Sequence, residues 1–227
     1  MNPNRSGSIL AAALIAAGSL FTALTAQAQL IVADTYGAPG ATPQNGWLVS
    51  GTNASFGGQQ TVGSMFRPSV SGELDALVLA LGDLSSMGYA STNVYNVALM
   101  TVDLESNLPG TLMESWSVSN VPGYVSDYFN FVRLDSALTP ELMAGTRYYI
   151  VASGVDGATG AWQWSPDLPA ADLLFYYENP GLGSGTEVNN LGAYRVLVSA
   201  NAVPEPSTYG LAGVAVLAAL IWRRMRR

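Results

Sequence analysis

The sequence predicts an all-β protein whose central part forms a single β-sandwich domain, jelly-roll-like in outline. Between residues 29 and 202, short apolar segments alternate with turns rich in Gly, Pro, Asn, Asp and Ser, which is typical of strands joined by tight connections. No long segment there has the 3.6-residue periodicity of an amphipathic helix. The segment has about 175 residues, enough for one buried core.

Nine segments have the length and composition of strands and are bounded by turn signals. A single sandwich accommodates this number of short strands. They are residues 61–66, 72–81, 94–103, 112–118, 128–134, 148–155, 161–165, 173–178 and 193–199.

Residue alternation within the segments supports the strand assignment. In 128–134 (YFNFVRL), Phe129, Phe131 and Arg133 are expected on one face, and Tyr128, Asn130, Val132 and Leu134 on the other. The segments RYYIVAS and AYRVLVS are more continuously apolar, which suits central strands.

One segment predicts a short helical turn. In 139–145, Thr139 is placed as the N-cap, Pro140 as the first helical residue and Gly145 as the closing residue.

The N-terminal segment 1–28 is typical of a signal peptide. Arg5 supplies the positive charge, an apolar run spans residues 9–24, and Ala26-Gln27-Ala28 places small residues at Ala26 and Ala28, where signal peptidase cleaves. The alternative is an N-terminal membrane anchor. The polar residues within the apolar run and the presence of a cleavage site argue against it. The mature chain is therefore expected to begin near Gln29.

The C-terminal segment 203–227 combines a Pro-Glu-Pro cluster, an apolar run and terminal arginines. As a helix at ~1.5 Å per residue, the run 209–222 reaches about 21 Å, short of a ~30 Å hydrocarbon core unless flanking residues extend it. Such a transmembrane helix would end in Trp222 at the interface and a cytoplasmic stop signal: Arg223, Arg224, Arg226 and Arg227. A packed core helix is the alternative, but the run has no polar face and follows two prolines.

This tail resembles the PEP-CTERM sorting signal of Gram-negative bacteria, in which Pro204, Glu205 and Pro206 form the sorting motif. The resemblance implies export through the secretion machinery and signal peptidase. It also implies tethering in the inner membrane, then processing by exosortase, which leaves the protein at the cell surface or outside the cell. Exopolysaccharide and biofilm are the setting that the family suggests.

The central domain resembles the choice-of-anchor R type of extracellular domain over residues 61–165. The resemblance rests on Val94-Tyr95-Asn96-Val97-Ala98-Leu99, on the turn 107–110 and on the segment from Leu138 through Gly145-Thr146-Arg147-Tyr148-Tyr149-Ile150-Val151. These domains have no assigned reaction, so the resemblance implies a surface role and no chemistry.

Charge and composition exclude several classes of site. Outside the two ends the chain has four arginines, no lysine and fifteen acidic residues, a formal charge of −11, which disfavours nucleic acid as a partner. The sequence contains neither cysteine nor histidine. Thiolate and imidazole catalysis and zinc sites built on those ligands are thereby excluded, and no cofactor is indicated.

Carboxylates are the remaining candidates for chemistry. A glycan-acting enzyme would need two carboxyls facing each other across a cleft, and no compact motif singles out such a pair, so we expect no catalytic residue. For calcium, Asp103, Glu105 and Asn107 alternate as in a calcium-binding loop, but Leu108 replaces the required glycine and no closing acid follows. A solvated hairpin loop is the favoured interpretation.

Aromatic residues give the one hint of a ligand. Trp162 and Trp164 are two residues apart and share a strand face, with Tyr176 and Tyr177 nearby in sequence. Exposed rings could stack on sugars, whereas large aromatics in a sandwich are more often core. The sequence therefore predicts an exported, non-enzymatic surface or matrix protein. The alternatives are a carbohydrate-binding module and a carboxylate-dependent glycan-acting enzyme.

Overall fold

A computed structural model describes residues 28–43, 45–167, 170, 172–180, 183–187 and 190–200. The predicted signal peptide up to residue 27, the sorting motif and the predicted helix 209–222 lie outside these residues. Within the described residues, no helix has the length and apolar character needed to cross a membrane.

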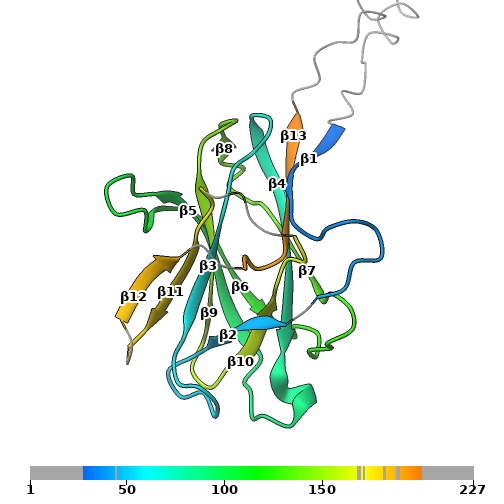
Figure 1. The fold of residues 1–227 in the computed structure, drawn as a ribbon, viewed down its shortest axis with the longest axis vertical. Helices are drawn as coiled ribbons and strands as arrows, with labels where there is room; N and C mark the ends of the chain where they lie inside the picture. The colour runs from blue at the N-terminus through cyan, green and yellow to red at the C-terminus, as the bar shows by residue number, and fades with distance from the viewer. Residues whose placement is uncertain are drawn as a thin grey trace, which may run out of the picture. The chain divides into compact units, whose positions relative to one another are not determined.

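The described chain is all-β and forms two antiparallel sheets, as the sequence predicts for a β-sandwich (Figure 1). The seven-stranded sheet has the order β1 (Ala28–Asp34), β13 (Tyr194–Ala200), β4 (Gly72–Asp83), β10 (Thr159–Gln163) and β2 (Gly46–Ser50), with β7 (Phe131–Asp135) and β8 (Glu141–Leu142) also paired to β4. The six-stranded sheet has the order β12 (Gly183–Glu187), β11 (Phe175–Asn179), β3 (Thr61–Phe66), β9 (Tyr148–Gly154), β5 (Val94–Val102) and β6 (Pro109–Ser119).

Strand β4 organises the first sheet. Its apolar sequence GELDALVLALGD gives twelve residues in extended conformation, long enough to pair with different strands along its length. On one edge β13 pairs from Glu73 to Leu79. On the other edge, β8 pairs at Gly72 and Glu73 and β7 at residues 76–80. β10 pairs with residues 81–83 and lies next to the start of β13, where Ala193 donates its backbone N–H to the carbonyl of Gln163. A single 3₁₀ turn, η1 (Leu84–Met87), follows β4.

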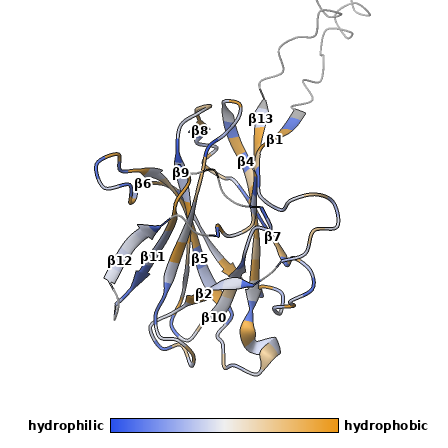
Figure 2. Ribbon diagram, viewed as in Figure 1, coloured by the Kyte–Doolittle hydropathy of each residue, from blue (hydrophilic) through white to orange (hydrophobic). Residues whose placement is uncertain are grey.

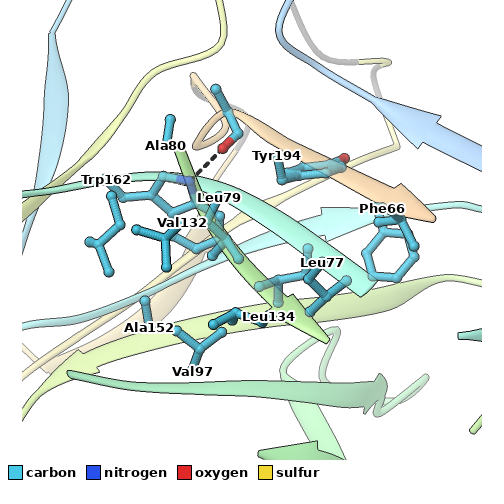
Figure 3. Packing of buried hydrophobic residues seen from close by; sticks show 14 of the residues in the cluster. Phe66, Leu77, Leu79, Ala80, Val97, Val132, Leu134, Ala152, Trp162 and Tyr194 are labelled. Carbon is cyan, nitrogen blue, oxygen red and sulfur yellow. Dashed lines mark hydrogen bonds between the residues drawn. The ribbon is translucent and has the colours of Figure 1, made fainter. Parts of the chain in front are cut away.

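The hydrophobic core lies between the two sheets. Alternate residues of β4 and β5, including Leu77, Leu79 and Val97, are fully buried with Phe66 of β3. Trp162 joins the same cluster, and its indole Nε1 donates to the carbonyl of Ala193 at 2.8 Å (Figure 3). Burial of this kind contributes about 25 cal/mol per Å² of apolar surface, so the sandwich has its own source of stability.

The first and last strands of the domain lie side by side. Thr35, just after β1, donates its backbone N–H to the carbonyl of Tyr194 at the start of β13, and Arg195 pairs with Asp34 at 2.7 Å. Since β1 is the neighbour of β13 along the sheet, the start of β1 and the end of β13 meet at the same end of the domain (Figure 1).

All nine predicted strands are present within a few residues of their expected bounds. Four strands of the described chain were not predicted. β12 is GSGTE, glycine-rich and polar; β8 has two residues; and β2 is a five-residue edge strand. β1 starts at the predicted cleavage site, where the sequence is dominated by the signal-peptide pattern.

The predicted helical turn at 139–145 is wrong. Thr139 has a positive φ of 45°, and Glu141–Leu142 form β8, paired with Gly72 and Glu73 of β4. The carbonyl of Pro140 accepts from the backbone N–H of Leu74 at 2.9 Å. An edge of β4 with unpaired backbone groups thus outweighs the local capping signals, because unpaired groups near the core are costly.

The rings of Phe129 and Phe131 lie on the same side of the chain, as the sequence predicts: their centroids are 6.4 Å apart, and both rings contact Tyr36. β7 begins only at Phe131, whose side chain is exposed, whereas Phe129 lies before the strand and is buried. Val132 and Leu134 point to the core and Arg133 to solvent, as alternation within the strand predicts.

Candidate functional site

Trp162 is a core residue and not a surface platform. Its side chain is fully buried and its Nε1 is hydrogen-bonded to Ala193. The core interpretation of this residue is therefore confirmed, and Trp162 cannot stack on a ligand.

Trp164 and Tyr177 belong to a second arrangement, an aromatic row with Trp47 and Phe175. Trp47 stacks on Phe175 with centroids 4.1 Å apart and contacts Trp164 at 5.4 Å, and Phe175 continues the row to Tyr177 at 6.4 Å. Phe175 is buried and the other three are half-buried. The row therefore functions mainly as packing at the edge of the core.

Tyr176 faces the other side of β11. It is buried beside Tyr149, with ring centroids 6.2 Å apart, and its hydroxyl donates to Glu178 at 2.9 Å. Burial, followed by the hydrogen bond to Glu178, raises the pKa of Tyr176 to about 12. The four predicted aromatic contacts thus do not form one exposed surface.

The calcium candidate at 103–107 folds as a hairpin loop between β5 and β6. The carboxylate of Asp103 accepts from the backbone N–H of Glu105 at 3.0 Å and from the Ser106 hydroxyl at 2.7 Å. The hydrogen bond from Ser106, then that from Glu105, lowers the pKa of Asp103. Asn107 takes a positive φ of 57°, and no group of three or more acidic residues gathers anywhere in the described chain. The loop geometry matches the favoured hairpin interpretation.

Two buried carboxylates hold loops in place. Glu114 of β6 accepts from the Ser136 hydroxyl at 2.5 Å and from the backbone N–H of Ala137 at 2.6 Å. Asp83, at the end of β4, accepts from the backbone N–H of Ser85 at 2.9 Å, the Ser91 hydroxyl at 2.5 Å and the Tyr95 hydroxyl at 2.6 Å. Both carboxylates are engaged in hydrogen bonds within the fold.

A pocket of about 300 Å³ lies next to the Asp83 network, and we call it the end pocket. Its walls come from the start of β2, the β2–β3 loop, η1 and the residues after it, the β6–β7 connection and β10. They are Asn45, Gly46, Leu48, Phe56, Leu84, Met87, Tyr89, Tyr124 and Ala161. Figure 2 shows the apolar residues at η1, the short coiled ribbon that follows β4.

Hydrogen bonds around Asp83 fix the loops that form the end pocket. Tyr124 donates its backbone N–H to the carbonyl of Asp83 at 2.7 Å, and Ser86 of η1 donates its hydroxyl to the carbonyl of Tyr124 at 2.9 Å. Gly88 closes η1 with a φ of 90°, a left-handed conformation that glycine adopts without strain. Burial raises the pKa of Asp83, but the hydrogen bonds from Ser85, Ser91 and Tyr95 outweigh it, so this pKa lies below its ordinary value.

Two further sets of hydrogen bonds hold the remaining walls of the end pocket in place. The hydroxyl of Ser55 donates to the carbonyl of Ala90 at 3.0 Å, which joins the Phe56 loop to the segment of Tyr89. Buried Gln163 donates to the carbonyls of Val125 and Tyr128 at 2.8 and 3.0 Å. The pocket is therefore preformed by contacts between loops distant in sequence.

The chemistry of the end pocket is aromatic and uncharged. Phe56 and Tyr89 are in ring contact, 4.8 Å apart, and Tyr124 provides a third ring. Burial raises the pKa of Tyr124, so its hydroxyl stays protonated at neutral pH. None of the lining residues is charged.

Sequence reasoning missed this pocket. Phe56 and Tyr89 stand in loops without any pattern linking them, and Asp83 is one of fifteen acids in the domain. The only sequence signal was the aromatic content of turn segments, which does not by itself indicate proximity.

A second pocket of about 270 Å³ is lined by Asp34, Thr35, Ser165, Asp167, Ala170, Leu173 and Leu191. It holds two carboxylates, but Arg195 binds Asp34 through Nε at 2.8 Å and through its terminal nitrogen at 2.7 Å. One of the two carboxylates of this pocket is therefore engaged in an ion pair.

Comparison with known proteins identifies the C-terminal tail. Residues 202–227 match the PEP-CTERM protein-sorting motif, as the sequence predicts for 203–227. No curated protein matches the chain, and the likeness of residues 61–165 to choice-of-anchor R domains stays a prediction. The motif is that of proteins exported, anchored in the membrane and processed by exosortase to the cell surface. The chain thus carries a PEP-CTERM sorting signal behind an all-β domain.

Proposed function

We propose that the chain is a non-enzymatic protein of the cell surface or extracellular matrix. It is exported by its signal peptide, held in the inner membrane by the helix 209–222 and released or transferred by exosortase at Pro204-Glu205-Pro206. In this role it contributes to the exopolysaccharide matrix or biofilm. The observation that carries the proposal is the PEP-CTERM motif at residues 202–227.

The geometry of the domain ends supports this processing order. The predicted signal cleavage after Ala28 falls at the start of β1, and the tail follows Ala200 at the end of β13, the neighbour of β1. Removing both segments leaves the sandwich complete, because β1 retains Gln29–Asp34 and the core residues all lie between residues 32 and 198. Folding and processing therefore do not compete.

A structural role is supported by how the ionisable groups are used. Asp83 and Glu114 hold loops, Arg133 contacts Asp75 and Asp135, Arg195 contacts Asp34, and Arg67 contacts Asp172. General acid–base work needs a group free to exchange a proton with substrate, and these groups are engaged within the fold.

The strand order supports the finer description of the fold as jelly-roll-like. The last strand, β13, lies between β1 and β4, and β9 lies between β3 and β5. Such insertion of late strands between early ones results when a long hairpin folds over on itself. We keep the choice-of-anchor R type as the proposed relationship of this domain.

The sorting proposal is tested by replacing Pro204, Glu205 and Pro206 with alanine in the native host. Export should continue, while an unprocessed precursor accumulates in the membrane fraction, because the recognition segment has lost its preordered extended shape. The wild-type chain in a strain lacking exosortase is the control and should give the same precursor. Unchanged processing of the alanine variant would contradict the proposal.

Carbohydrate binding is the second candidate. The surface predicted from Trp162, Trp164, Tyr176 and Tyr177 does not support this candidate, because Trp162 and Tyr176 are buried. The observation that favours it is the end pocket, in which the exposed ring of Phe56 lies beside the half-buried ring of Tyr89.

A further inference from the structure

We propose that the end pocket binds one sugar ring of a neutral polysaccharide. The inference deepens the proposed carbohydrate-binding role and is independent of sorting by exosortase. It rests on the size, ring content, free polar groups, charge and rigidity of the pocket.

The size of the pocket selects a small ligand. Its volume of about 300 Å³ is at the lower end of the roughly 300–1000 Å³ typical of small-molecule sites. A single ring with part of its neighbour fits such a volume, whereas an amphipathic helix of a partner protein needs a long groove.

The aromatic side chains offer faces for the C–H groups of a sugar. Phe56 is 47% exposed and Tyr89 is half-buried, with their ring planes inclined at 39°. The exposed ring of Phe56, tilted against the half-buried ring of Tyr89, leaves a face available for stacking. Met87, 59% exposed, adds an adaptable apolar contact beside them.

The polar groups of the pocket are unused by the fold. Among the described residues, the side-chain amide of Asn45 and the hydroxyls of Tyr89 and Tyr124 make no hydrogen bond. An amide and two phenols both donate and accept, which is what sugar hydroxyls require. A purely hydrophobic ligand such as an acyl chain would leave these groups unsatisfied.

Charge separates neutral polymers from acidic ones. The lining has no charged residue, and the domain around it has a formal charge of −11. A polymer of uronic acids or sulfated sugars would be repelled, since its carboxylates would meet no cation in the pocket. A neutral hexose polymer is not repelled by the negative charge of the domain, and it needs no cation in the pocket.

The rigidity of the pocket walls reduces the entropy lost on binding. The Asp83 network joins η1, Ser91 and the Tyr124 segment, and the bond from Ser55 to Ala90 secures the Phe56 loop. Preformed sites bind more tightly than sites that order with the ligand. This also gives the buried network a purpose beyond stability.

The test uses the full-length chain purified in a zwitterionic, sugar-free detergent. The probes are the neutral and acidic fractions of the host's own extracellular polysaccharide, separated by anion exchange and immobilised for biolayer interferometry. The wild-type chain should bind the neutral fraction alone. Phe56→Ala and Tyr89→Ala should each weaken binding by about tenfold, the loss expected when one stacking ring is removed from a small site.

Phe131→Ala is the matched control, because Phe131 is 60% exposed and lies outside the pocket; it should bind as wild type. Circular dichroism checks that every variant keeps its fold, and Asn45→Ala gives a second readout that does not alter any ring. The proposal is overturned if the wild-type chain ignores the neutral fraction, prefers the acidic one, or binds equally after the pocket substitutions. Self-association abolished by Phe56→Ala, without sugar binding, would assign the pocket to a second copy of the chain.

Discussion

Replacing Asp83 with alanine should strongly destabilise the domain, although the residue is a single carboxylate at the end of a strand. The side chain is fully buried and accepts hydrogen bonds from Ser85, Ser91 and Tyr95. Alanine removes all three acceptor contacts and deprives the Tyr95 hydroxyl of its carboxylate acceptor inside the core, since Tyr95 is also fully buried.

The size of the effect follows from these contacts. Hydrogen bonds to a charged group contribute about 1.5–3 kcal/mol each, and an orphaned buried donor costs about 1–3 kcal/mol. Water can reach Ser85, which is exposed, so the three losses do not add fully. We expect the free energy of unfolding to fall by about 3–5 kcal/mol, which lowers Tm by roughly 6–20 °C for a domain of this length.

The assay is urea denaturation of the fragment 29–200, a compact unit, followed by tryptophan fluorescence. The hydrogen-bonded carboxylate has a lowered pKa, so its contribution is complete above the unfolded-state pKa of about 3.9 and is lost as pH falls through the folded pKa. The difference between wild type and Asp83→Ala should therefore be constant from pH 6 to 8 and shrink below about pH 4.

Asp127→Ala is the comparison for the loss of one acidic residue at the surface, and it should change stability by less than about 0.5 kcal/mol. An Asp83→Ala fragment as stable as Asp127→Ala would refute the assigned role of Asp83. A stability difference that stays unchanged down to pH 3 would show that the charge of the carboxylate does not matter.

Two further predictions concern the core and the N-terminus. Gly192→Ala should lower the free energy of unfolding by about 1–3 kcal/mol, because a Cβ at Gly192 would lie closer to the Trp162 indole than van der Waals contact allows. Urea denaturation measures this loss of stability. An unchanged free energy of unfolding would mean that Trp162 can shift to make room. Intact-mass analysis of the mature protein should give a chain starting near Gln29, and a chain that still carries Met1 would contradict the signal-peptide prediction.

The strands could be predicted because burial imposes a period on the residues that form them. In β5 the buried Tyr95, Val97 and Leu99 alternate with less buried neighbours, and that pattern is visible without a structure. Edge strands have no such requirement, and β12, with three small residues among five, shows no period at all. At 139–145 the local capping signals gave a wrong prediction of a helical turn, because pairing with β4 is the stronger interaction there.

The candidate site could not be predicted for a different reason. The end pocket depends on hydrogen bonds between residues far apart in the chain, such as Ser55 with Ala90 and Gln163 with Tyr128. Hydrogen-bond partners of this kind leave no spacing or periodicity in a single sequence. The tail is the opposite case, because its motif is local and contiguous, and the sequence alone was sufficient to find it.

The register between β13 and β4 has a consequence for how the domain is presented. Ser199 pairs with Glu73, while η1, a wall of the end pocket, begins just after Asp83 at the other end of β4. At about 3.3 Å per strand residue, the two points are roughly 33 Å apart. The end of β13 and the η1 wall of the pocket thus lie at opposite ends of β4. Ligand capture is therefore expected to be equally possible in the tethered precursor and in the released product.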